Sequence, residues 1–355
     1  MKLGIVGLPF SGKTTVFHAL TGAHGAAGGY SGKASTAVVN VPDQRAERLC
    51  EMFTPKSVHL AQIEYVDIPG VSASDRHDQI VGTLAAIRQV DALLQVVRCF
   101  DDPAAPHPRG SVDPLRDVQE LWEELVVADM DVAERRVEKL RKQVTKPTPS
   151  QEQDKKQLAV LERCLEAFER GDGVGSLGLS DDEELAIRAF QFLTIKPMLF
   201  VLNVAEDRLG SPETEEQAAR LGGEAVAMSA RIEQEIAELD PAERGEFMEE
   251  LGVSELASER LVRACYRLLR LRSFFTGLGD DFRVWTVKEG DTALEAAGEI
   301  HSDIQRGFIR AEVMGCEDVF ELGSEKAVRA AGRARLEGKD YLVRDGDIIL
   351  FRFKV

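Results

Sequence analysis

Residues 7–14 read Gly-Leu-Pro-Phe-Ser-Gly-Lys-Thr and match the pattern G-x-x-x-x-G-K-[ST] without a mismatch. The apolar run at residues 3–6 predicts a strand before them, and residues 15–20 predict a helix after them. This order of strand, glycine-rich loop and helix is the context in which the pattern forms a P-loop. Backbone N–H groups of such a loop, together with the helix N-terminus, bind phosphate oxygens. The stretch therefore predicts a nucleotide-binding α/β domain.

A second motif, Asp67-Ile68-Pro69-Gly70, ends the strand predicted at residues 62–66. A D-x-x-G tetrapeptide alone marks a turn as often as a nucleotide sensor. Following a P-loop, it predicts that Asp67 reaches Mg²⁺ through water and that Gly70 senses the γ-phosphate. Lys13 is expected to contact the β and γ phosphates, and the Thr14 hydroxyl to ligate Mg²⁺. Lys13, Thr14 and Gly70 are the predicted catalytic residues.

The composition is that of a globular protein, with 355 residues of which 44% are hydrophobic and 30% charged. The net charge of −17 argues against broad non-specific binding to nucleic acid, and no sequence-specific DNA partner is expected. Five separated cysteines without a C-x-x-C predict neither a disulfide framework nor a zinc site. The absence of a long apolar run and of a signal-peptide pattern predicts a cytoplasmic protein without a membrane partner.

The domain organisation follows from the order of the patterns. Predicted strands alternate with helices, which favours a parallel sheet with helices on both faces. They lie at residues 3–6, 38–41, 62–66, 92–97, 197–202 and 225–228. Residues 113–180 interrupt this series with two charged helices whose apolar positions recur every three or four residues, which predicts a helical hairpin with a coiled-coil seam. We therefore expect a nucleotide-binding domain over 1–272, with the hairpin inserted, and a second domain over 273–355.

The second domain is predicted to be a small mixed β domain. Its strands are expected at residues 283–287, 308–314, 341–343 and 347–353, with a helix at 292–300.

The residues expected to select the base follow the strands at 197–202 and 225–228. GTPases carry N-K-x-D in the first of these places, whereas this chain has Asn203-Val204-Ala205-Glu206. Guanine offers its N1–H and N2 amino group to a carboxylate, and adenine offers neither to it. Loss of the aspartate and the lysine together therefore favours ATP over GTP. A degenerate motif that still accepts GTP is the alternative.

At this point the chain resembles the YchF or Obg-like ATPases, a family of Obg-related P-loop proteins, over nearly its whole length. The resemblance rests on the two nucleotide motifs, the hairpin, and three further stretches. These stretches are residues 97–102 (Val-Arg-Cys-Phe-Asp-Asp), residues 203–206, and residues 335–347 with 297–303 and 307–313. It implies that the C-terminal domain is a ubiquitin-like TGS domain. It also implies ATP and Mg²⁺ as cofactors, slow hydrolysis, and association with the ribosome, most simply the large subunit.

The resemblance also implies the site residues. Phosphate contacts are expected from Phe10, Ser11, Gly12, Lys13, Thr14 and Thr15. Base contacts are expected from Asn203, Val204 and Glu206, with Ser229 and Ala230 nearby. The metal ligands implied are Thr14, Thr36 and Asp67, with Ser31 or Ser35 as alternatives to Thr36 because switch I lacks the family's usual sequence. Phe10-Ser11 replaces the family's usual Asn-Val, so potassium stimulation is left open.

Val71 follows the D-x-x-G where Ras-like enzymes place a glutamine that orients the attacking water. Valine cannot do so, which predicts slow unstimulated turnover. The protein is expected to be a monomer. A rival interpretation with the same ligand residues is an ATP-gated binding module whose hydrolysis is vestigial.

Overall fold

The computed structural model describes residues 1–22, 35–70, 77–250 and 255–354. It divides into two compact units, Met1–Ala37 with Glu64–Arg260, and Val38–Ile63 with Leu261–Val355. Residues 38–63 thus belong with the C-terminal part of the chain, although they are flanked in sequence by the nucleotide motifs.

The first unit contains the P-loop sheet and its helices, with β2, β4 and α10 crossing the unit boundary. The strands are β1 (Lys2–Val6), β2 (Ser35–Asn40), β4 (Gln62–Asp67), β5 (Ala92–Cys99), β6 (Met198–Val204) and β7 (Ala225–Met228). The helices are α1 (Lys13–Thr21), α3 (His77–Arg88), α4 (Pro114–Gln143), α5 (Gln151–Glu169), α6 (Asp181–Ile187), α7 (Pro212–Arg220), α8 (Ala230–Glu238), α9 (Pro241–Glu250) and α10 (Ala257–Leu268).

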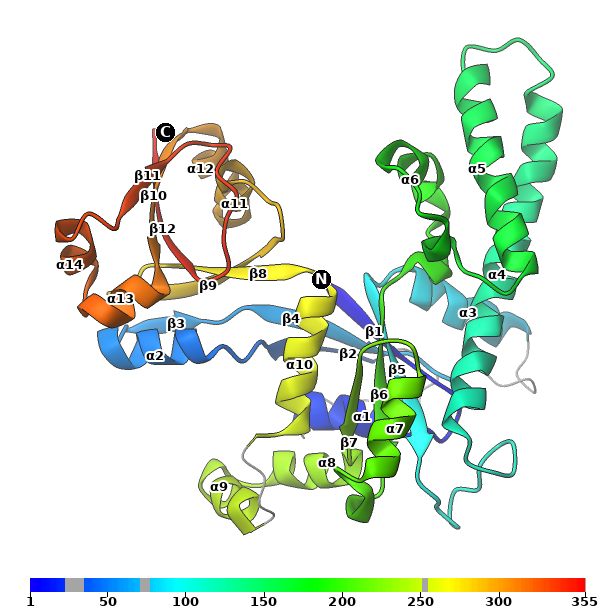
Figure 1. Cartoon of the computed structure of the whole chain (residues 1–355), viewed down its shortest axis with the longest axis horizontal. Coiled ribbons are helices and arrows are strands. Elements are labelled where there is room, and N and C mark those ends of the chain that lie inside the picture. Colours follow the sequence, from blue (N-terminus) through cyan, green and yellow to red (C-terminus); the bar gives the residue numbers. More distant parts are fainter. Residues whose placement is uncertain (23–34, 71–76, 251–254, 355) are drawn as a thin grey trace. The chain divides into compact units, whose positions relative to one another are not determined.

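The sheet of this unit has the order β2-β4-β1-β5-β6-β7 (Figure 1). The pairs β1–β4, β1–β5, β5–β6 and β6–β7 are parallel. Every residue of β5 is buried, as expected of a central strand covered on both faces. Because parallel strands end at the same edge of a sheet, the loops after β1, β4, β5 and β6 meet there. The predicted P-loop α/β sheet is confirmed.

Helices α4 and α5 form the predicted hairpin and lie side by side as a long arm (Figure 1). Asp113 caps α4, because its side chain accepts a hydrogen bond from the Arg116 N–H, and Pro114 begins the helix. The expected seam is buried, with Ala133, Val137 and Leu140 packed against α5 residues. No helix in the described part of the chain is both long enough and apolar enough to cross a membrane.

The base of the arm is fastened to α3 by Arg88. Its Nη1 donates to Asp129 Oδ1 of α4 at 3.3 Å and to the Gln191 carbonyl at 3.0 Å. Asp129 is fully buried and also accepts the Thr194 N–H and hydroxyl, both at 2.9 Å. Burial raises the pKa of Asp129, and these bonds oppose that rise. A single buried carboxylate therefore joins the helix after the D-x-x-G motif to the arm.

The second unit contains a mixed sheet of order β11-β10-β12-β8-β9-β3. Its strands are β3 (Ser57–His59), β8 (Leu271–Thr276), β9 (Asp281–Lys288), β10 (Phe308–Gly315), β11 (Arg335–Glu337) and β12 (Asp347–Phe353). Its helices are α2 (Gln44–Phe53), α11 (Ala293–Ile300), α12 (Ser302–Arg306), α13 (Cys316–Leu322) and α14 (Glu325–Ala330). Phe274, Ala296 and Val313 lie in its core. Its identification as a TGS domain stays a prediction.

One expectation for this unit was wrong, and two of its strands were missed. Residues 341–343 form no strand, since Leu342 makes only an isolated bridge to Thr292, and Val343 donates instead to the Asp291 carbonyl at 3.0 Å. Strand β11, at one edge of the sheet, was missed. It has three residues and its central Leu336 is exposed, so the sequence shows no clear strand pattern there. Strand β8 was also missed, because it follows α10 with only two residues between them.

Candidate nucleotide site

Glycine is required at both ends of the P-loop. Gly7 has φ +150° and Gly12 has φ +92°, values that residues with a side chain rarely adopt. A Cβ at Gly7 would lie 2.4 Å from the Val96 carbonyl oxygen, and one at Gly12 would lie 2.2 Å from Asn203 Nδ2. The loop is thus pressed against the ends of β5 and β6, and only glycine fits at these two positions.

Lys13 begins α1 and is only 8% exposed, with its Nζ donating to the Leu8 carbonyl at 2.9 Å. Burial lowers the pKa of Lys13 to about 8, and the nearby Asp67 charge opposes this shift. Gly70 packs directly on this amine, because a Cβ there would lie 2.8 Å from Lys13 Nζ and 3.0 Å from the Gly7 carbonyl oxygen. The D-x-x-G glycine therefore lies against the lysine that is expected to bind phosphate.

Thr14 and Asp67, predicted metal ligands from two separate motifs, are brought together. The Thr14 hydroxyl donates to Asp67 Oδ2 at 2.8 Å, and Asp67 Oδ1 is buried with no hydrogen-bond partner. Burial raises the pKa of Asp67, while the Thr14 bond and the Lys13 charge lower it. A hydroxyl and a carboxylate with one unpartnered oxygen suit Mg²⁺, which prefers oxygen ligands. Among the described residues, no group of three His, Cys, Asp or Glu side chains is placed to hold a metal.

The third predicted metal ligand, Thr36, is exposed in β2, beside the half-buried Ser35. Its alternative Ser31 lies outside the described residues, as does Val71.

On the base side, Asn203 is 5% exposed and uses both ends of its amide. Nδ2 donates to the Ser11 carbonyl at 3.0 Å, and Oδ1 accepts the Ala230 N–H at 3.1 Å. The side chain thus ties the P-loop to the corner between β7 and α8, where Ser229 and Ala230 are buried. Asn203, the P-loop and the Ser229–Ala230 corner are brought together as predicted, but the amide is occupied by the protein.

Val204 and Glu206 differ in exposure. Val204 is 2% exposed and packs with Val97, Phe200 and Leu202, so its side chain is part of the core. Glu206 begins a short 3-10 helix, Glu206–Arg208, and is exposed. It is therefore the one side chain of this motif that is free to contact a base in the described structure.

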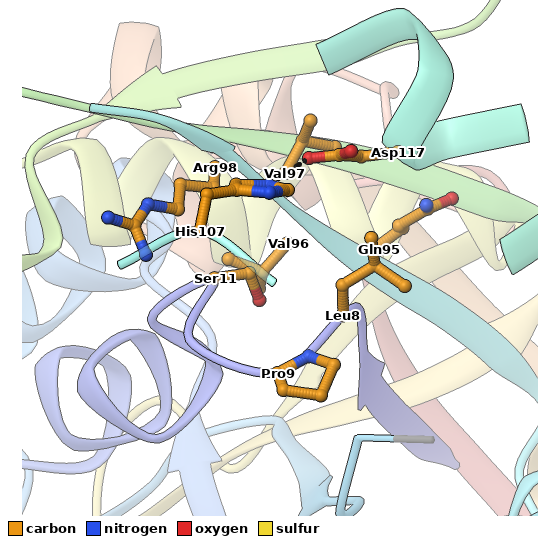
Figure 2. Close-up of a pocket in the computed structure, with 9 residues that line it drawn as sticks. All are labelled: Leu8, Pro9, Ser11, Gln95, Val96, Val97, Arg98, His107 and Asp117. Atoms are coloured by element: carbon orange, nitrogen blue, oxygen red, sulfur yellow. Dashed lines mark hydrogen bonds and ion pairs between the residues drawn. The ribbon is translucent and has the colours of Figure 1, made fainter. Parts of the chain in front are cut away.

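The remaining P-loop positions have distinct environments. Phe10 has φ +63° and a side chain that is 57% exposed, Thr15 is half-buried, and Ser11 is 2% exposed. The Ser11 side chain lines a small pocket on the β5 side of the loop, together with Leu8, Pro9 and residues 95–98 (Figure 2). Its Oγ is buried there without a hydrogen-bond partner. Lys13, Thr14 and Asp67 do not line this pocket.

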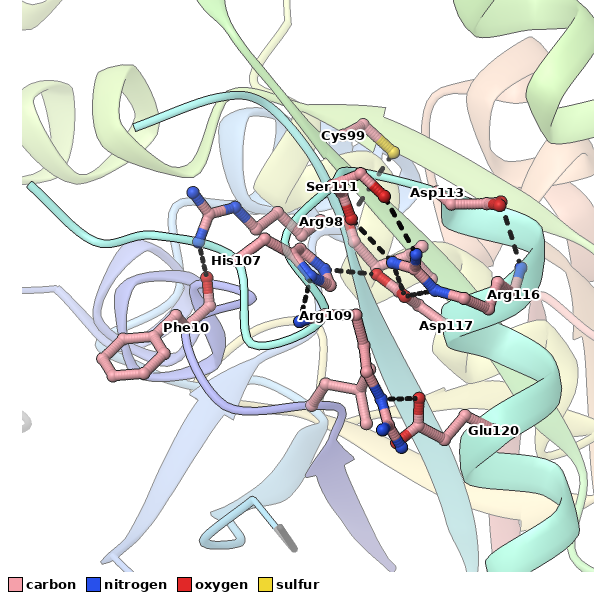
Figure 3. A network of polar contacts seen from close by, with 12 residues as sticks. Phe10, Arg98, Cys99, His107, Arg109, Ser111, Asp113, Arg116, Asp117 and Glu120 are labelled. Atoms are coloured by element: carbon pink, nitrogen blue, oxygen red, sulfur yellow. Dashed lines mark hydrogen bonds and ion pairs between the residues drawn. The ribbon is translucent and has the colours of Figure 1, made fainter. Parts of the chain in front are cut away.

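A polar network beside this pocket was not anticipated (Figure 3). His107 Nδ1 accepts the Arg109 N–H at 3.1 Å, so Nε2 carries the proton that is donated to Asp117 Oδ2 at 2.8 Å. Arg116 binds the other oxygen of Asp117. These bonds fix residues 101–113, which connect β5 to the arm, at the first turn of α4.

Arg98 was also missed as a functional residue. It is 2% exposed near the end of β5, and its Nη1 donates to the Phe10 carbonyl at 3.3 Å. The sequence feature that could have indicated Arg98 is an arginine within a largely apolar strand. A buried guanidinium needs hydrogen-bond partners that the fold must supply.

Comparison with known proteins decides the family. Residues 2–145 match a family model described as 50S ribosome-binding GTPase, and residues 271–354 match the model of the YchF GTPase C-terminal domain, described as a protein of unknown function. The chain is 41% identical over 363 residues to the "Ribosome-binding ATPase YchF" of Haemophilus influenzae, covering 100% of this chain and 99% of the relative. The chain belongs to the YchF family.

Two further YchF proteins support this assignment. The "Ribosome-binding ATPase YchF" of Bacillus subtilis is 38% identical over 370 residues, with complete coverage of both chains. The solved structure of the Schizosaccharomyces pombe YchF GTPase superposes with a TM-score of 0.86 at 30% identity, covering 99% of this chain and 97% of that one. The family predicted from sequence is confirmed, and the YchF fold extends over both units.

Proposed function

We propose that this protein is a ribosome-binding ATPase that requires Mg²⁺ and hydrolyses ATP slowly. The observation that carries the proposal is the contact between Thr14 of the P-loop and Asp67 of the D-x-x-G motif. It occurs in a chain that matches relatives named ribosome-binding ATPases over its full length.

In this proposal Thr14 and Asp67 hold Mg²⁺, with Thr36 as a third candidate, and nucleotide oxygens and water complete the coordination. The unpartnered Asp67 Oδ1 supports the assignment, because a buried carboxylate oxygen without a donor is costly unless a cation or water binds it. Bound Mg²⁺ would neutralise charge on the phosphate oxygens.

The chain's own residues bind and orient the triphosphate. Lys13 supplies a buried positive charge for the β and γ phosphates, and the loop supplies main-chain N–H groups through residues 10–15. Gly70 leaves space beside Lys13 that a side chain would fill. Since none of these groups orients a water, we expect unstimulated turnover on the order of 10⁻⁴ to 10⁻³ s⁻¹.

Glu206, rather than the lysine and aspartate of a GTPase motif, faces solvent on the base side, which supports ATP as the preferred nucleotide. Calorimetric titration of the protein with ATP and GTP in the presence of Mg²⁺ tests this. Tighter binding of ATP is expected, and equal affinity or a preference for GTP would favour an Obg-type GTPase.

We propose that the arm contacts the ribosome, with the large subunit as the first candidate partner. The candidate basic residues are Arg135, Arg136, Lys139, Arg141 and Lys142. Several already pair with acidic side chains of the arm, as Arg141 does with Glu162 at 2.8 Å and Lys142 with Glu138 at 2.6 Å. Exposed pairs of this kind contribute about 0–1 kcal/mol, so rRNA phosphates can replace the carboxylates at little cost.

Co-sedimentation with ribosomes tests this proposal. More protein should sediment with a non-hydrolysable ATP analogue than with ADP, and Arg141→Glu with Lys142→Glu should reduce the bound fraction without changing ATP affinity. The matched control reverses two exposed charges elsewhere, Arg231→Glu with Lys56→Glu. Equal loss in both double variants would mean that net charge, and not the arm, governs binding. Equal sedimentation in all nucleotide states would exclude a nucleotide-gated switch.

A further inference from the structure

Side chains near the ends of β5 and β6 donate hydrogen bonds to two consecutive carbonyl groups of the P-loop. Arg98 and Asn203 are directly opposite each other in the parallel register of these strands. Arg98 Nη1 donates to the Phe10 carbonyl at 3.3 Å, and Asn203 Nδ2 donates to the Ser11 carbonyl at 3.0 Å. Because the C=O and the next N–H of a trans peptide point in opposite directions, the grip on Ser11 turns the Gly12 N–H away from Asn203.

The residue held by Arg98 has a strained backbone. Phe10 has φ +63°, a left-handed conformation in which a bulky residue is an outlier, so the backbone is strained there. Its side chain is 57% exposed, so packing does not hold it there. The contact that we find at its carbonyl is the one from Arg98, which Figure 3 shows reaching across to the loop.

Arg98 itself has no structural ion pair in the described part of the chain. It is 2% exposed and donates to the Phe10 and Phe100 carbonyls, and its guanidinium carbon lies 4.6 Å from the centroid of the Phe100 ring. Burying a guanidinium without a carboxylate is costly, so the bonds that Arg98 makes to the two carbonyls must offset part of that cost. The adjacent strand offers no cation, because position 204 is a buried valine.

We propose that Arg98 is a positioning residue of the nucleotide site, one that holds Phe10 in its left-handed conformation and so keeps the P-loop preset for phosphate. The proposal rests on the proposed nucleotide binding. Arg98 acts through the Phe10 main chain, and its effect depends on the strain at residue 10. That dependence separates it from a residue that merely supports the fold.

A double-mutant cycle tests this dependence, with affinity for a non-hydrolysable ATP analogue and Mg²⁺ as the readout. Arg98→Gln should weaken binding about tenfold, since one charge-assisted bond to a strained loop is lost. Phe10→Gly removes the strain at residue 10, because glycine adopts φ +63° without strain, and the affinity measured for this variant is the reference for the second arm of the cycle. In the double variant, Arg98→Gln should cost less than about threefold relative to Phe10→Gly alone.

Arg109→Gln is the matched control. Arg109 is a nearby exposed arginine whose side chain pairs with Glu120, with no hydrogen bond to the P-loop among the described residues, so its loss should leave affinity unchanged. If Arg98→Gln does not fold, Arg98→Lys is measured in the same cycle, with a smaller loss that Phe10→Gly again relieves.

The proposal is overturned if Arg98→Gln binds as the wild type does, or if its loss is undiminished when residue 10 is glycine. In the second case Arg98 acts by charge or by support of the fold. Failure of the wild-type protein to bind any nucleotide would instead refute the proposed function, and the two failures are therefore distinguishable.

Discussion

The phosphate side and the base side of the candidate site use their motif residues differently. On the phosphate side, Lys13, Thr14 and Asp67 keep groups that a ligand can still engage, including the unpartnered Asp67 Oδ1. On the base side, Asn203 uses both ends of its amide to bond the protein and Val204 is buried in the core. A motif residue can thus stabilise the protein around a site instead of binding the ligand. Three predictions distinguish these two roles.

The largest effect is expected from Lys13→Ala, which removes a buried charge whose one hydrogen bond among the described residues is to the Leu8 carbonyl. Triphosphate affinity should fall by about 100-fold or more, since a charge-assisted bond contributes about 1.5–3 kcal/mol and this amine is expected to make two. Calorimetry measures the affinity, and Lys2→Ala, which breaks an exposed pair with Glu64, is the control. Unchanged affinity in Lys13→Ala would refute the P-loop assignment.

The second effect concerns pH. The pKa of Lys13 is lowered to about 8, so the free protein loses this proton above pH 8, whereas the bound phosphates favour the ammonium form. Binding then takes up a proton, and the association constant should fall by up to about tenfold per pH unit above pH 8 while staying level below it.

The nucleotide-free protein should show the opposite trend. The pKa of Lys13 is about 8 in the folded protein and has its ordinary value of 10.5 in the unfolded chain, so the unfolded chain binds more protons between these values. This group therefore raises the free energy of unfolding with pH in that window. Lys13→Arg stays charged and should lose both trends, which titrations and denaturant unfolding at pH 7, 8 and 9 will measure. Wild-type affinity that is level up to pH 9 would contradict the buried-lysine argument.

The smallest effects on affinity should come from the base side, where two variants should have different effects. Asn203→Ala leaves the Ser11 carbonyl and the Ala230 N–H without their partner, so it should lower the free energy of unfolding by about 1–3 kcal/mol and weaken both nucleotides similarly. Glu206→Asp, at an exposed position, should leave stability unchanged and move the ATP to GTP ratio by a few-fold. Denaturant unfolding and parallel titrations measure the two outcomes.

A reversal of these two phenotypes would show that Asn203 reads the base and that Glu206 supports the frame. Val204→Lys is not a clean probe of base selection, because it would place an amine among Val97, Phe200 and Leu202.

Sequence reasoning predicted the parallel sheet, the arm and the approach of Thr14 to Asp67, because local periodicity and motif spacing encode them. It could not predict the hydrogen bond of Arg98 to the Phe10 carbonyl, which is 88 residues away. Every residue has a main-chain carbonyl, so the sequence does not show which one a side chain will bind. It also read Val204 as a ligand position from its place in a motif, whereas burial depends on how α7 and the neighbouring strands pack. The membership of residues 38–63 in the C-terminal unit depends on the long-range pairing of β3 with β9.

That pairing sets an order of events during synthesis. Strand β3 pairs in parallel with β9 at Ser57–Asp281, and Arg45 of α2 binds Asp345 at 2.8 Å, a separation of 300 residues. A ribosome adds about 5–20 residues per second, so α2 and β3 wait on the order of 10–60 s for the partners that complete their unit. During that time β3 is an unpaired edge that needs protection from other strands. For the same reason, a fragment that starts at residue 271 lacks the strand that closes one edge of its sheet.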